Sequence, residues 1–70
     1  MRIISQDGTI DMPYDQTAIQ RNECVIFGNA AGRHGKILAY YATEDRAMQA
    51  MDRLQVAYLR DDKYFRFQKE

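Results

Sequence analysis

The lone cysteine, Cys24, is the feature that most restricts how this chain can hold a fold together. The chain has 70 residues and a single histidine, His34, so it can form neither an internal disulfide nor the four-ligand site of a structural zinc ion. A domain of this size buries only about 60% of its unfolded surface and often needs a further stabiliser. The sequence therefore predicts a single domain over residues 1–70 that is completed by homo-oligomerisation.

The charged residues do not indicate a general electrostatic partner. Ten basic and ten acidic side chains cancel to a formal net charge of +0, which does not favour general binding to nucleic acid or to an anionic membrane. The apolar runs are far shorter than the ~20 residues that span a bilayer. The opening MRIISQDG lacks the long apolar region of a signal peptide, and a lone thiol suits a reducing compartment. We therefore expect a cytoplasmic protein without membrane contact.

The first fourteen residues predict a β-hairpin. Asp7-Gly8 is a favoured two-residue turn of type I′, which needs a positive φ at both positions. This turn pairs Ser5 with Ile10. It also pairs Ile3 with Met12, so the apolar side chains share one face of the hairpin.

The segment from Thr17 to Ala42 predicts two or three further strands. ECVIFGN and KILAYYA are rich in β-branched and aromatic residues. They flank GNAAGRHG, whose three glycines predict a mobile loop. Residues 24–27 and 37–42 are apolar on both faces, which is typical of strands that are covered on both sides. We expect that either the sheet curls over itself or a second subunit covers the face that a helix leaves open.

Residues from Thr43 to about Arg60 predict the one helix. Thr43 can cap it, and two acidic residues follow at the positive end of the helix dipole. Its apolar stripe consists of Ala47, Ala50, Met51, Leu54, Ala57 and Tyr58. KYFRFQKE then alternates as a last strand. The fold class predicted is α+β, with a small antiparallel β-sheet of about five strands packed against one α-helix and a final strand after the helix.

Three aspartates spaced four residues apart, Asp7, Asp11 and Asp15, raise the question of a metal site. A calcium loop of the EF-hand type needs acidic residues at alternate positions and a glycine at the sixth. Position six after Asp7 is Met12, so the motif fails. Asp-Gly turn chemistry explains Asp7 without a ligand, and we expect no metal.

The stretch GNAAGRHGK is the best candidate for a ligand site. Its glycines let backbone N–H groups approach an anion, and Arg33, His34 and Lys36 add positive charge. The spacing is not that of a P-loop, because Ile37 stands where Ser or Thr is required. The alternative is a solvated loop. The predicted ligand-binding residues are Arg33, His34 and Lys36, with Arg21 and Arg66 from neighbouring strands.

Catalysis is not expected. Cys24 and His34 are the residue types of a nucleophile and its base, but Cys24 lies in an apolar stretch, where a thiol is usually buried and inert. We expect no enzymatic activity, no catalytic residue and no cofactor.

Two stretches of the chain carry a resemblance. MRIISQDGTIDMPYDQT and YYATEDRAMQAM resemble a group of short proteins from phages and prophages of Gram-positive bacteria, over roughly forty percent of the chain. The group is distantly similar to the Thoeris anti-defence sponges, small oligomeric phage proteins that sequester cyclic nucleotide signals. The resemblance implies a phage-related origin in the cytoplasm of a host cell. It transfers no site residue to this chain.

Three functions follow as expectations. The first is a non-enzymatic counter-defence sponge that binds a small, nucleotide-like anion. The second is a protein-binding inhibitor or accessory factor that acts on a host protein through an exposed sheet face. The third is a purely structural subunit.

Overall fold

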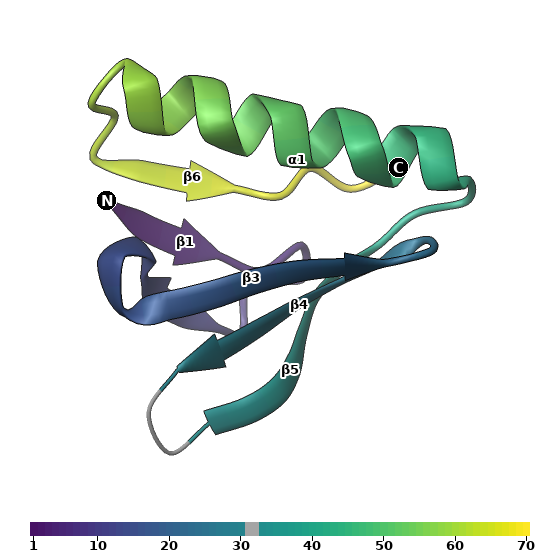
Figure 1. Cartoon of the computed structure of the whole chain (residues 1–70), viewed down its shortest axis with the longest axis horizontal. Helices are drawn as coiled ribbons and strands as arrows, with labels where there is room; N and C mark the ends of the chain where they lie inside the picture. Colours follow the sequence, from purple (N-terminus) through teal and green to yellow (C-terminus); the bar gives the residue numbers. More distant parts are fainter. Residues whose placement is uncertain (31–32) are drawn as a thin grey trace.

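The computed structural model describes residues 1–30 and 33–70, without the side chains of residues 33 and 34. An α-helix and six strands make up most of this part of the chain (Figure 1). The α+β class and a last strand after the helix are as predicted. The elements in order are β1 (Arg2–Ile4), β2 (Asp11–Pro13), the 3-10 helix η1 (Tyr14–Gln16), β3 (Thr17–Asn22), β4 (Val25–Ala30), β5 (Arg33–Tyr40), α1 (Glu44–Leu59) and β6 (Tyr64–Arg66).

The strands divide into two sheets, so the prediction of one antiparallel sheet of about five strands is not confirmed. One three-stranded sheet has the order β2-β1-β6 and the other β3-β4-β5. In the first, Ile3 lies opposite Met12 as predicted, but β6 runs parallel to β1. Pro13, which cannot donate to a ladder, is the last residue of β2. The turn of η1 follows, and β3 then begins the second sheet.

The turn of the first hairpin differs from the predicted type I′. Gly8 has a φ of 79°, but Asp7 does not share the positive φ. The N–H of Gly8 donates to the C=O of Ser5 over 3.0 Å, which centres the turn on Gln6 and Asp7. The Asp7 carboxylate accepts hydrogen bonds from the Ser5 hydroxyl and from the N–H and hydroxyl of Thr9, at 2.7, 3.0 and 2.7 Å. Asp7 is therefore a structural turn residue, as predicted.

The predicted loop over GNAAGRHG is largely strand. β4 continues through Ala30 and β5 begins at Arg33, while residues 31 and 32 lie outside the described part. Gly28 is buried in β4. A side chain at this position would meet Leu38 and Met12 in the core. A bulge then shifts the β4–β5 register, and both Leu38 and Ala39 become buried. Close packing, rather than ligand approach, thus explains this glycine.

The helix begins and ends close to the predicted residues. The Thr43 hydroxyl accepts from the N–H of Arg46 at 3.2 Å, so Thr43 is the N-cap. At the other end Asp61 has a φ of 61°. The N–H of Asp61 donates to Tyr58 and that of Asp62 to Ala57. These two bonds form a Schellman motif, with an aspartate where glycine is preferred.

One core joins both sheets and the helix. α1 contacts β3 of one sheet and β6 of the other, so the inner faces of both sheets meet its small alanine side chains. Ile37 and Tyr40 of β5 point away from this core and are 57% and 66% exposed, so the described chain itself leaves that face of β5 open. The buried cluster contains Ile3, Met12, Ile26, Leu38, Ala39, Tyr41, Ala47, Ala50, Leu54 and Phe67.

Gln6 links three separate parts of the fold. Its backbone N–H donates to Leu38 of β5 at 2.7 Å. Its side-chain oxygen accepts from the N–H of Tyr40 at 3.0 Å, and its side-chain nitrogen donates to the C=O of Gln68 at 2.9 Å. One amide thus ties the first hairpin to the edge of the second sheet and to the residues after β6.

Candidate functional site

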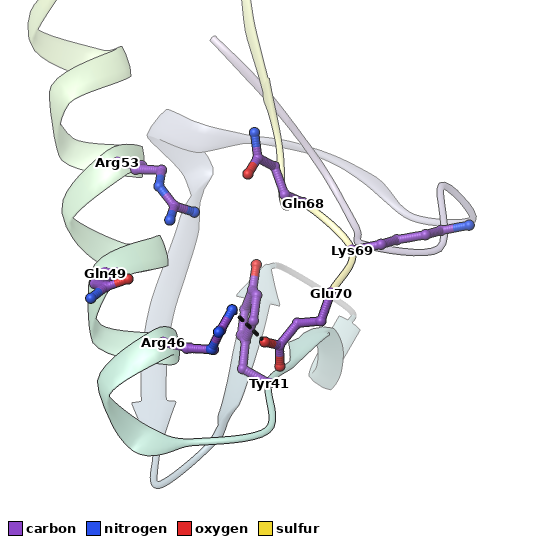
Figure 2. A pocket seen from close by; sticks show the side chains of 7 residues that line it. All are labelled: Tyr41, Arg46, Gln49, Arg53, Gln68, Lys69 and Glu70. Atoms are coloured by element: carbon purple, nitrogen blue, oxygen red, sulfur yellow. Dashed lines mark ion pairs between the residues drawn. The ribbon is translucent and has the colours of Figure 1, made fainter.

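A polar hollow of about 70 Å³ lies between α1 and the residues that follow β6 (Figure 2). We call it the Tyr41 hollow, and we call residues 67–70 the C-terminal segment. A water molecule needs roughly 10–15 Å³ of such space, so the hollow holds a compact polar group and not a whole nucleotide. Its lining residues are Tyr41, Arg46, Gln49, Arg53, Gln68, Lys69 and Glu70.

Tyr41 is the central side chain of the hollow. The strand β5 ends at Tyr40, and the N–H of Tyr41 donates to the C=O of Cys24 at 2.9 Å, which fixes its position before the helix. Only 4% of the residue is exposed. Its phenol oxygen is buried and has no hydrogen-bond partner among the described residues. A buried tyrosine hydroxyl usually finds such a partner, so this one has an unused hydrogen bond to donate.

The Tyr41 phenol is protonated at neutral pH. Burial raises its pKa above the ordinary 10.0, the nearby Arg53 lowers it and Glu70 raises it. The hydroxyl therefore enters the hollow as a hydrogen-bond donor and not as a negative charge.

Two arginines of α1 border the hollow. Arg46 and Arg53 lie about two turns apart on the helix, so their side chains project toward the same side. Figure 2 shows both directed toward Tyr41 and the C-terminal segment, whereas Lys69 points away. Arg46 pairs with Glu70 at 3.1 Å. Within residues 1–30 and 33–70, Arg53 has no ion pair, so its guanidinium charge is not neutralised by a carboxylate there.

The Glu70 carboxylate already lies at one side of the hollow. One oxygen pairs with Nη1 of Arg46, and the other accepts from the backbone N–H of Ala42. The Glu70 side chain is 26% exposed, compared with 57% for Glu44 and for Asp11 in two other ion pairs. Cations and donors thus outnumber acceptors in the hollow, and the chemistry that this favours is the binding of a compact anion.

The predicted ligand-binding residues lie on three strands, β3, β5 and β6. The guanidinium of Arg21 donates to the C=O of Glu23 at 3.0 Å and lies 3.8 Å from Glu44. The Arg66 guanidinium lies beside Gly8 of the hairpin turn. Lys36 is exposed on β5, and the side chains of Arg33 and His34 lie outside the described part. Among the described side chains of this set, no hydrogen bond or ion pair joins one member to another.

The residues of the Tyr41 hollow were missed by sequence reasoning. Arg46 and Arg53 lie off the apolar stripe of the helix, which predicts a solvated face. Tyr41 belongs to residues 37–42, which the sequence predicts to be covered on both faces, and it is buried. The available signal was a tyrosine just before a helix cap, followed by two arginines on one side of that helix.

The sequence predicts that Cys24 lies within a strand, but it lies in the turn between β3 and β4. The thiol is half-buried and free. Among the described residues, no three His, Cys, Asp or Glu side chains are grouped as metal ligands would be. The described part of the chain also lacks a helix with the length and apolar character needed to cross a membrane.

Comparison with known proteins adds no relative. No protein-family model matches the chain. Neither the curated proteins nor the solved structures contain a match.

Proposed function

We propose that this chain is a non-enzymatic binding protein that captures the anionic group of a ligand in the Tyr41 hollow. The observation that carries the proposal is the buried Tyr41 phenol, which has no partner among the described residues and lines the same hollow as Arg53 and Arg46. A phosphate or carboxylate oxygen placed there accepts from the phenol and pairs with Arg53. Arginine suits this role because its planar fork can hold an oxyanion by two hydrogen bonds.

The energetics favour such a ligand. An unsatisfied buried polar group costs about 1–3 kcal/mol in the free protein. A ligand that accepts a hydrogen bond from Tyr41 removes that cost upon binding. The low exposure of the phenol strengthens the interaction, because a charge is less screened away from water.

The size of the hollow limits what it can enclose. With Glu70 in place it takes one compact group, so the body of a larger ligand rests on the surface outside. An adjoining shallow hollow shares Arg53 and Gln68 and is lined by the apolar side chains of Val56 and Phe65. A nucleotide-like signal, with its anionic group inside and its ring outside, fits this division. The wider proposal of a phage or prophage counter-defence sponge in the host cytoplasm rests on the resemblance described above.

The test is a titration with inorganic phosphate that is monitored by calorimetry and by NMR of the backbone amides. Hydrogen bonds to charged groups contribute ~1.5–3 kcal/mol, so Tyr41→Phe and Arg53→Gln should each weaken binding by about tenfold or more. Tyr41→Phe should also raise the melting temperature of the free protein, because it removes an unsatisfied buried hydroxyl. This opposite movement of stability and affinity is specific to a ligand-binding phenol.

Lys36→Gln is the matched control, since it removes one positive charge from the segment that the sequence singled out. It should leave phosphate affinity unchanged. If Lys36→Gln weakens binding and the two hollow variants do not, the site lies at residues 33–36 and the proposal for the Tyr41 hollow is wrong.

The alternative function is binding to a host protein, or to a second copy of the chain, through an exposed sheet face. Ile37 and Tyr40 of β5 favour it, because they are 57% and 66% exposed. Sedimentation across micromolar concentrations tests the homo-oligomer. A single 8.2 kDa species would remove it, and Tyr40→Ser should dissociate any oligomer that forms through this face.

A further inference from the structure

We propose that the Tyr41 hollow contains two adjoining anion subsites, one of which Glu70 fills, and that a ligand with two linked phosphate groups occupies both by displacing Glu70. This inference rests on the proposed function and names its ligand class. The filled subsite consists of Arg46 and the N–H of Ala42. The second consists of Tyr41 and Arg53.

The contacts of Glu70 define the filled subsite. Its carboxylate is held by a guanidinium at 3.1 Å and by a backbone N–H one residue before the helix cap. The start of a helix carries partial positive charge, which stabilises an anion there. A carboxylate that the chain supplies itself thus occupies a position that equally suits a phosphate oxygen.

The second subsite lies in the same hollow but has a different set of donors. The phenol of Tyr41 has no partner and Arg53 has no ion pair in the described part of the chain. A single phosphate can bind here while Glu70 remains in place. A second phosphate linked to the first would approach Glu70 closely, and like charges repel. The second phosphate therefore replaces the carboxylate on Arg46.

The C-terminal segment is built so that Glu70 can leave without unfolding the domain. Phe67 is fully buried, and the side chain of Gln6 holds the C=O of Gln68 at 2.9 Å. These anchors lie before Lys69, so the side chain of Glu70 can rotate away from Arg46 while the strand stays in place. A diphosphate is favoured over a dicarboxylate of similar size because it carries more negative charge for the arginines to neutralise.

The test compares phosphate with pyrophosphate on the full chain and on two variants. Glu70→Gln keeps the shape of the side chain but removes the competing charge. Asp11→Asn is the matched control. Asp11 also pairs with an arginine, Arg2 at 2.8 Å, but it lies on β2 and does not line the hollow. Glu70→Gln should tighten pyrophosphate binding by about tenfold, the effect of one charged hydrogen bond, and phosphate binding by less than about threefold. Asp11→Asn should behave as the parent.

NMR gives a second measurement that needs no variant. In the parent protein, pyrophosphate should shift the Ala42 amide resonance far more than phosphate does. Only pyrophosphate replaces the Glu70 carboxylate as the acceptor of the hydrogen bond from the Ala42 N–H.

Three results would overturn the inference. Equal gains for Glu70→Gln and Asp11→Asn would reduce the effect to net charge. Equal gains for phosphate and pyrophosphate would leave a single subsite. If pyrophosphate does not shift the Ala42 amide resonance, Glu70 has stayed in place. If neither anion binds the parent or Glu70→Gln, the proposed function itself fails, which is a distinct outcome from phosphate binding without displacement.

Discussion

Gly28→Ala tests whether the GNAAGRHG segment is a packed strand or a ligand loop. A methyl group at position 28 would lie 2.8 Å from Cδ1 and 3.3 Å from Cγ of Leu38, and 3.1 Å from Sδ of Met12. Rotating the end of the Leu38 side chain does not relieve the contact with Cγ. Leu38 and Met12 are both 1% exposed, so neither side chain has open space to enter.

The expected magnitude is a balance of two effects. Overpacking of a core typically costs about 1–3 kcal/mol. Replacing glycine by alanine returns ~0.4–1 kcal/mol, because the unfolded chain loses fewer conformations on folding. The overpacking effect is larger, and we expect a net loss of about 1–2 kcal/mol. For a domain of this size, that loss lowers the melting temperature by roughly 5–15 °C.

Thermal and urea unfolding of Gly28→Ala, Leu38→Val and the double variant provide the assay. Leu38→Val removes the methyl group that collides, so the double variant should be more stable than the sum of the single effects by at least about 0.5 kcal/mol. Gly35→Ala is the control, since a methyl group at position 35 meets nothing within 4 Å but the φ of 63° is unfavourable. Its effect should add to that of Leu38→Val. A Gly28→Ala protein as stable as the parent would refute the packed-strand account.

Three further predictions concern turns. Asp61→Gly should stabilise the fold by about 0.5–1 kcal/mol in urea unfolding, because glycine adopts the left-handed φ of 61° without the cost that a side chain imposes. Gly8→Val should destabilise it by about 1–3 kcal/mol, since a β-branched residue must then take a φ of 79°, and an unchanged melting temperature would contradict this. Hydrogen bonds from Ser5 and Thr9 lower the pKa of Asp7 from 3.8 to about 2, so its contribution to stability is present above that range and is lost as the pH falls through about 2. Asp7→Asn should therefore flatten the dependence of melting temperature on pH between 4 and 2, and an equally steep dependence would count against the pairing.

The first hairpin and the helix could be predicted because their signals are local. The alternation around Asp7-Gly8 sets the register, and Thr43 with the stripe of apolar residues sets the helix. The turn type was wrong for a reason that lies in the side chains. The Asp7 carboxylate accepts from Thr9, and the Ser5 hydroxyl accepts from the N–H of Ile10 at 3.0 Å, so the side chains stabilise a longer turn than the two-residue type I′.

The division into two sheets depends on contacts between distant residues, which no local pattern contains. The alternation of Phe65 and Phe67 predicts a strand but not its partner or direction. The strand β6 pairs in parallel with β1 and so belongs to the first sheet, while β3, β4 and β5 form a separate second sheet. The contacts of Gln6 reach positions 38, 40 and 68, and nothing in the hairpin sequence distinguishes this glutamine from a solvated one.

The candidate site is hidden from the sequence for the same physical reason. A helical wheel assigns Arg46 and Arg53 to the exposed face, and both are exposed in the structure, but the wheel does not show that the C-terminal segment lies alongside them. The burial of Phe67 and the Gln68 hydrogen bond hold it there, and Glu70 then meets Arg46 at 3.1 Å. What marks the place as a site is a departure from a structural rule, a buried hydroxyl on Tyr41 that no described residue satisfies. Sequence can predict that a tyrosine is buried, but only the arrangement of its neighbours shows that its hydroxyl lacks a partner.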